Sequence, residues 1–144
     1  MNSVTVGLKH VQLTEKIIQV FYAVYNEMGY GFLESCYHNA MEIGLVQAGL
    51  KVDRQVQIDV WFRGHKVGLF FADLVVNGLV ILELKSARAI DPNFEVQLLN
   101  YLRATTIEVG LLLNFGPRPE FKRLAFDNDR KKCLGPPPGP TPVD

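Results

Sequence analysis

Three charged residues, Asp73, Glu83 and Lys85, stand in otherwise apolar stretches of this sequence. An ionised side chain in such a setting is costly unless it is paired or binds a cation. Glu83 and Lys85 are two residues apart, so they project from the same face of a strand, and a hairpin would bring Asp73 back beside them. Two converging carboxylates suit Mg²⁺ or Mn²⁺, and a neighbouring lysine can orient or help deprotonate water. The pattern indicates metal-assisted phosphodiester hydrolysis; the alternative is a strand end where Lys85 bridges an acid.

The turn between the two segments decides whether the carboxylates can meet. A two-residue Asn77-Gly78 turn would put Asp73 and Glu83 on opposite faces of the sheet. A loop of residues 76–78, with Gly78 in the left-handed region, would make them diagonal neighbours on one face. We therefore predict that the hairpin is not a regular two-residue turn. We expect the carboxylates of Asp73 and Glu83 to converge, with Lys85 in the same pocket.

The elements that must position these residues follow from the spacing of apolar side chains. Helical spacing extends over residues 13–28, with Thr14 or a neighbour as cap, and again over residues 33–45. Alternation typical of strands follows in residues 52–62, 67–76 and 79–85. Asp91-Pro92 starts a third helix that ends near residue 104, and residues 108–115 form a buried strand. A further short edge strand could follow in residues 121–126.

The order α-α-β-β-β-α-β predicts an α/β (α+β) fold, with a mixed β-sheet of about four strands flanked by helices. The length of 144 residues and the apolar content of 48% predict one domain over residues 1–133. The Pro/Gly-rich residues 134–144 should form a tail without regular structure.

Composition limits the possible partners and location. Fifteen basic and fifteen acidic residues exclude a global basic field, so any phosphate-binding surface must be local. Cys36 and Cys133 are too far apart to suggest a zinc site or a disulfide framework. No signal-peptide pattern or membrane-length apolar run is visible, so we expect a cytoplasmic protein without a membrane partner.

Four blocks in the right order resemble the PD-(D/E)xK nuclease superfamily, and more narrowly its GxxExxY family. They are residues 29–37 (Gly-Tyr-Gly-Phe-Leu-Glu-Ser-Cys-Tyr), 71–76, 83–86 and 110–116, and the likeness covers roughly residues 13–126. The residue before Asp73 is Ala72 instead of the proline in the superfamily's name. The resemblance implies a restriction-endonuclease-like core, metal ligands Asp73, Glu83 and the Leu84 carbonyl, a catalytic Lys85, and Glu34 completing the site.

Gln97 and Tyr101 are one helical turn apart, and Q-x-x-x-Y is similar to RecB-like nucleases, where the pair assists at the active site. The alternative is that Tyr101 is an ordinary core aromatic. His38 lies one turn after Glu34, but a lone helical histidine is more often a surface or core residue, so we place it outside the site, as we do His10 and His65.

A basic cluster precedes the tail, and we interpret it as a solvated charge run that could also touch a nucleic-acid backbone. It contains Lys122, Arg123, Arg130, Lys131 and Lys132.

We therefore expect a Mg²⁺- or Mn²⁺-dependent nuclease acting on nucleic acid, with DNA as the preferred substrate. A homodimer would supply a second DNA-facing surface. Alternatives are a non-catalytic nucleic-acid-binding or protein-interaction module that retains the fold, and a phosphohydrolase acting on a smaller substrate. The predicted catalytic residues are Glu34, Asp73, Glu83, Lys85, Gln97 and Tyr101.

Overall fold

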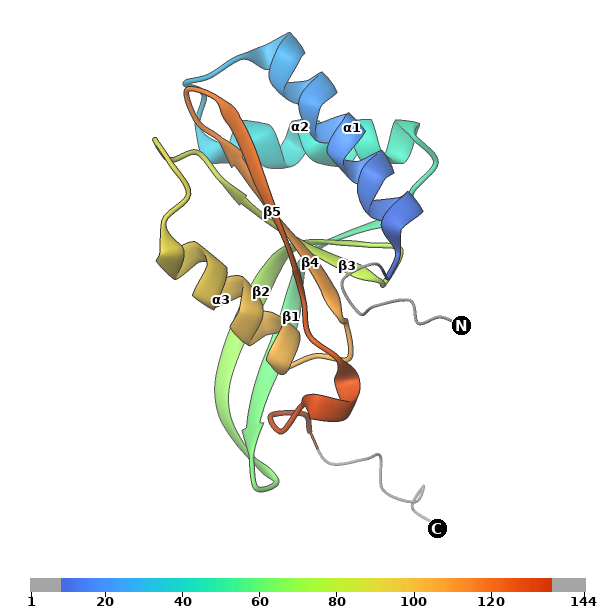
Figure 1. The fold of residues 1–144 in the computed structure, drawn as a ribbon, viewed down its shortest axis with the longest axis vertical. Coiled ribbons are helices and arrows are strands. Elements are labelled where there is room, and N and C mark those ends of the chain that lie inside the picture. Colours follow the sequence, from blue (N-terminus) through green and yellow to red (C-terminus); the bar gives the residue numbers. More distant parts are fainter. Residues whose placement is uncertain (1–8, 136–144) are drawn as a thin grey trace.

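Helices and strands follow the predicted order, with one strand added at the end. The structure, a computed structural model, describes residues 9–135 (Figure 1). The elements are α1 (Val11–Met28), α2 (Glu34–Gln47), β1 (Val52–Phe62), β2 (His65–Val76), β3 (Val80–Lys85), α3 (Pro92–Arg103), β4 (Val109–Phe115), β5 (Pro119–Ala125) and a short 3₁₀ helix (Asn128–Arg130). No helix in this part of the chain is long and apolar enough to cross a membrane.

The strands form one mixed sheet in the spatial order β1-β2-β3-β4-β5. Only β3 and β4 are parallel, and α3 makes the crossover between them, as the sequence predicts. The sheet has five strands where the sequence indicated about four, because β5 pairs antiparallel with β4 along its whole length. The mixed burial of β5 explains why its sequence lacks clear alternation.

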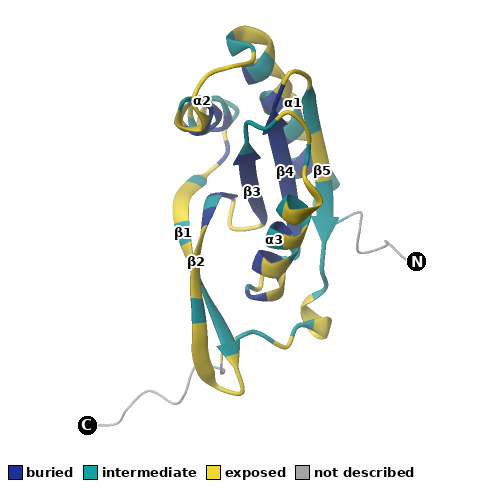
Figure 2. Cartoon of the chain, turned by 90° about the vertical axis from the view of Figure 1, so that its left-hand side faces the viewer, coloured by how far each residue is buried: buried dark blue, intermediate teal, exposed yellow. Residues whose placement is uncertain are grey.

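Helices cover both faces of the sheet (Figures 1 and 2). On one face, α1 and α2 pack Phe21 and Met41 against the apolar side chains of β3 and β4. On the other, α3 packs Leu98 and Leu102 against Ile81 of β3. The central strands β3 and β4 are therefore buried on both faces, which is usual for a parallel pair.

The start of α1 differs from the prediction. Its N-cap is His10, which has a φ of 58° and makes no side-chain capping bond. The Thr14 hydroxyl lies inside the first turn and donates to the Val11 carbonyl at 3.0 Å. Thr14 as a cap is thus wrong, because the helix already begins at Val11, three residues earlier.

The turn between β2 and β3 is irregular, as predicted, but its loop lies one residue later than residues 76–78. Val76 pairs with Val80, which leaves a three-residue loop of residues 77–79. Asn77 and Gly78 both have positive φ, 53° and 67°, and the Leu79 N–H donates to the Val76 carbonyl at 2.9 Å. Leu79 is therefore the extra residue that changes the register.

The sheet forks beyond this hairpin. The β2–β3 ladder ends at the pair Leu74 and Leu82, while β1 and β2 continue together as a two-stranded arm (Figure 2). One more pair in the same register would put Asp73 directly opposite Glu83, instead of diagonal to it as predicted. Asp73 therefore stands where β2 leaves β3.

The arm also changes face at the fork. Leu74 packs with the α1–α2 core, whereas Ala72, two residues earlier, packs with the α3 core. On the neighbouring strand Arg54 bonds to α2 residues while Val56 packs against the α3 core. Gln55, between them, has a φ of 51°. This local distortion directs the arm toward α3.

The C-terminal segment, residues 127–135, returns to the arm, and we name it the strap. Lys131 Nζ donates to the carbonyls of Thr105 and Ile107 at 2.6 and 2.7 Å. The Trp61 N–H of β1 donates to the Cys133 carbonyl at 3.2 Å. Of the tail predicted over residues 134–144, all but the first two residues lie outside the described part of the chain.

Candidate active site

Asp73 and Glu83 join the two strands across the fork. Glu83 Oε2 accepts the Asp73 N–H at 2.8 Å, and Asp73 Oδ2 accepts the Leu84 N–H at 2.8 Å. Each carboxylate thus bonds to the backbone of the opposite strand, in the place of the missing ladder bonds. Rigid strands hold the two side chains together, as the predicted convergence requires.

The environment of Glu83 opposes its ionisation. The residue is only 3% exposed. Burial and the nearby Asp73 charge raise the pKa of Glu83 to about 8, although the Asp73 N–H and Lys85 act in the opposite direction. Glu34 adds to the repulsion. A bound cation would offset the repulsion between these carboxylates, so the carboxylates of this site fit a divalent metal.

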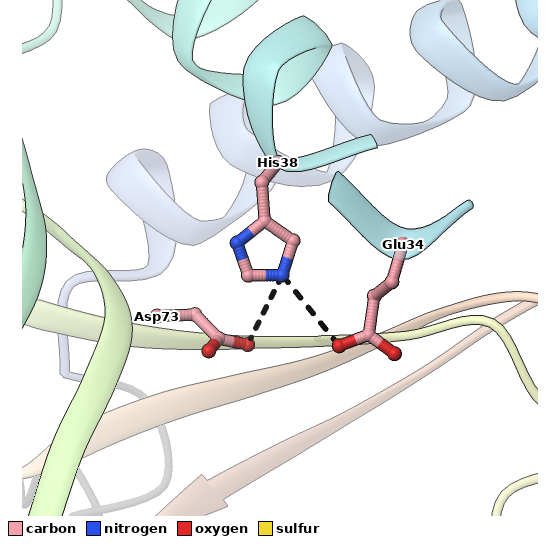
Figure 3. A group of neighbouring side chains, drawn as sticks. All are labelled: Glu34, His38 and Asp73. Carbon is pink, nitrogen blue, oxygen red and sulfur yellow. Dashed lines mark ion pairs between the residues drawn. The ribbon is translucent and has the colours of Figure 1, made fainter. Parts of the chain in front are cut away.

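Two side chains of α2, those of Glu34 and His38, lie close to the Asp73 carboxylate (Figure 3). His38 Nε2 lies 3.6 Å from Glu34 Oε1 and 3.6 Å from Asp73 Oδ2. Ligand atoms of all three residues lie within 4.8 Å of one another, a spacing that could hold a metal ion. The sequence interpretation placed His38 outside the site, whereas the structure puts its ring between the two carboxylates. Its spacing from Glu34 was the available signal.

The connection between α1 and α2 explains how Glu34 is placed. Gly31 has a φ of 112°, a conformation that residues with a side chain rarely adopt. The Tyr37 hydroxyl donates to the Gly29 carbonyl at 2.6 Å and accepts the Phe32 N–H at 3.2 Å. Tyr37 is itself buried. The tyrosine therefore ties the loop to the core directly before Glu34 begins α2.

A second group of side chains extends from β3 to α3. Lys85 Nζ donates to Gln97 Oε1 at 3.1 Å, and Gln97 Nε2 donates to the Tyr101 hydroxyl at 3.1 Å. Burial and the charge of Glu83 raise the pKa of Tyr101. Tyr101 is also a core residue, 6% exposed, as the alternative of a core aromatic describes; its role at an active site stays a prediction.

Lys85 has no ion pair with a carboxylate within residues 9–135. Its ammonium group lies 4.8 Å from the centre of the Phe94 ring and is held by a neutral amide. The alternative of a strand end with Lys85 bridging an acid does not describe this arrangement. The structure instead brings all six predicted site residues together in two linked groups around the fork.

Residues 11–124 match the family model of the PD-(D/E)XK nuclease superfamily. The chain belongs to this superfamily. No curated protein matches its sequence.

Two solved structures are similar to this chain at low sequence identity. The crystal structure of SSO0001 has a TM-score of 0.52 and 17% identity, and the match covers 84% of this chain and 61% of that one. An alkaline exonuclease (LHK-Exo) from Laribacter hongkongensis has a TM-score of 0.49 and 11% identity, with coverage of 88% and 79%. The likeness to SSO0001 concerns the fold alone, and this chain spans 61% of that protein's length.

Asn114 of β4 holds the turn that follows Lys85 in this chain. The sequence interpretation missed this role. Asn114 is fully buried, and its side chain accepts the Ala87 N–H at 2.9 Å and donates to the Ala87 carbonyl at 3.0 Å. A Cβ at Gly116 would lie 2.3 Å from that carbonyl oxygen. The signal in the sequence was an amide in an apolar strand, because a buried amide requires partners.

Proposed function

We propose that this chain is a metal-dependent nuclease that hydrolyses phosphodiester bonds in DNA. The observation that carries the proposal is the pair of interlocked carboxylates, Asp73 and Glu83, beside an ammonium group that has no carboxylate partner among the described residues. A surface ion pair would neutralise the positive charge of Lys85. In this arrangement that charge stays available to a negatively charged substrate.

Asp73, Glu83, Glu34 and the Leu84 carbonyl would hold Mg²⁺ or Mn²⁺. His38 offers a nitrogen in the same group, which suits Mn²⁺ better than Mg²⁺. When bound, the metal would polarise the phosphate and lower the pKa of a bound water.

The remaining side chains would orient and stabilise charge. Gln97 fixes the Lys85 ammonium group, which in our proposal faces the negative charge that develops on the phosphate oxygens. The Tyr101 hydroxyl accepts a hydrogen bond from Gln97 and thereby orients the amide oxygen toward Lys85. The hydroxyl proton of Tyr101 is left to donate to the substrate.

The test is cleavage of linear, circular and single-stranded DNA and of RNA, each with Mg²⁺, Mn²⁺ or EDTA. We expect metal-dependent cleavage of DNA that falls about 100-fold or more in Lys85→Ala and in Asp73→Asn. Lys66→Ala is the matched control, because Lys66 pairs with Asp59 on the arm, at 3.1 Å.

Cleavage that persists in EDTA, or that survives in both site variants, would rule out this mechanism. Binding of DNA without cleavage under every metal condition would favour the alternative, a non-catalytic module that retains the nuclease fold.

A further inference from the structure

A continuous groove leads away from Gln97 and Tyr101 along α3. A hollow of about 290 Å³ lies beside these two residues, with Phe70 of the arm also in its lining. A second hollow shares Phe70, Asn100 and Tyr101 with the first and extends to Arg103. Because the two hollows share residues, they form one surface between α3 and the arm, which we name the α3 groove.

The groove ends in a basic patch. A third hollow shares Arg103 with the second and adds Phe126, Arg130 and Lys132. The guanidinium groups of Arg103 and Arg130 lie 5.4 and 4.9 Å from the centre of the Phe126 ring. We name these three residues, Arg103, Phe126 and Arg130, the clamp.

Among the described residues, no acidic side chain neutralises the charges of the patch. Across residues 9–135, neither Arg103, Arg130 nor Lys132 forms an ion pair. Neighbouring cations differ: Lys9 pairs with Glu108 and Asp127, at 3.0 and 3.3 Å. The patch therefore combines free positive charge with guanidinium donors, which suits the phosphates of a polyanion.

An aromatic surface lies between the basic patch and the proposed active site. Phe70 is 47% exposed, and its ring centre is 5.8 Å from that of Tyr101. A side chain at Gly68 would contact the edge of the Phe70 ring, at 3.4 Å, so the glycine leaves that edge open. An exposed phenylalanine beside a polar amide such as Asn100 suits stacking with a nucleobase.

We propose that the α3 groove binds a single strand of nucleic acid, with a base stacked on Phe70 and backbone phosphates on the clamp. This inference rests on the proposed nuclease function, since the groove adjoins that site. Single strands fit because a duplex keeps its base faces stacked inside, where Phe70 would not reach them. The balanced net charge of the chain is consistent with this proposal, because a few local phosphate contacts are enough to bind a single strand.

Binding is tested apart from cleavage by fluorescence anisotropy in EDTA, with labelled 12-nucleotide single-stranded DNA, its RNA equivalent and the matched duplex. We expect both single strands to bind at least tenfold more tightly than the duplex. Phe70→Ser should weaken single-strand binding about tenfold, whereas Phe62→Ser, at an exposed phenylalanine near the arm's tip, should not.

The clamp is tested by its salt dependence. Arg103→Ala combined with Arg130→Ala should reduce the slope of log affinity against log salt by about 1 to 1.5. Arg63→Ala is the control, because Arg63 stacks on Phe62 outside the groove.

Equal affinity for duplex and single strand, or unchanged binding by Phe70→Ser, would overturn the groove. A wild-type protein that binds the single strand in this manner but never cleaves would overturn only the proposed nuclease function. Preference for RNA over DNA would keep the groove and change the substrate class.

Discussion

At the scale of single residues, Glu83 shows which electrostatic effect dominates the site. It accepts a backbone hydrogen bond and lies near Lys85, and both favour the carboxylate. Burial together with the charges of Asp73 and Glu34 outweighs them, and the net effect raises the pKa of Glu83 to about 8. The metal-free protein therefore keeps a proton on Glu83 at neutral pH and ionises it only at a cost in stability.

This cost predicts a pH dependence of stability. The pKa of Glu83 is higher in the folded chain, about 8, than its ordinary value of 4.5. Between these values the folded state binds more protons, so its contribution to stability is lost as pH rises from about 4.5 to 8. In EDTA, Glu83→Gln should thus be more stable than wild type at pH 9 by a few kcal/mol, and nearly equal at pH 4.

Urea unfolding of both proteins from pH 4 to 9 measures this difference. Glu15→Gln, an exposed acid of α1, is the control and should show no such pH-dependent gain. A wild-type curve that stays parallel to the Glu83→Gln curve across the range would show that Glu83 ionises freely in the folded protein.

Residue types predicted most of the site, because a charge in an apolar strand is a strong anomaly. This anomaly is what indicated Asp73, Glu83 and Lys85 as candidate site residues. His38 was not, because a helical histidine is common, and only the fold shows that α2 brings it within 3.6 Å of Asp73. Asn114 was missed for a similar reason, since its partner, Ala87, is 27 residues away in sequence.

At the scale of elements, apolar spacing predicted the helices and the parallel crossover, but not the details of register. Asn77-Gly78 is a strong turn signal, yet the extra loop residue is Leu79, whose type does not indicate it. The sequence also did not indicate the change of face at Gln55, because a positive φ at a glutamine depends on the surrounding strands. Local sequence therefore located the hairpin without specifying which residues oppose each other.

The connection between α1 and α2 makes a test at this scale possible. Tyr37→Phe keeps the ring stacked on Phe115, with ring centres 4.3 Å apart, but removes the bonds to Gly29 and Phe32. Each bond contributes on the order of 1 kcal/mol, so unfolding free energy should fall by about 1 to 2 kcal/mol. The looser loop should also displace Glu34 and lower the proposed nuclease activity.

The matched control is Tyr22→Phe on α1, where the ring is exposed and its hydroxyl has no hydrogen bond within the described residues. Chemical denaturation measures stability and cleavage assays measure the site. Equal stability of Tyr37→Phe and wild type would show that the hydroxyl does not hold the loop.

At the scale of the whole molecule, the fork separates the sheet into a buried centre and a two-stranded arm. The centre is covered on both faces by helices, whereas the arm has exposed large side chains such as Phe62, Val67 and Phe71. A two-stranded ribbon is marginally stable by itself, so the contacts at its far end matter. The strap makes those contacts. Its sequence, residues 127–135, has no apolar periodicity that would indicate this role.

The strap predicts a specific effect of truncation. Ending the chain after residue 130 removes the two carbonyl contacts of Lys131 and the bond from the Trp61 N–H to Cys133. We expect faster hydrogen exchange at the Trp61 amide, by about tenfold or more, because its acceptor is gone and the arm opens locally. Amides of β3 and β4 should keep their protection, since helices cover both faces of these strands.

Ending the chain after residue 135 preserves all of these contacts, so this control should exchange like the full chain. Unchanged exchange at Trp61 in the shorter protein would show that the arm is stable without the strap.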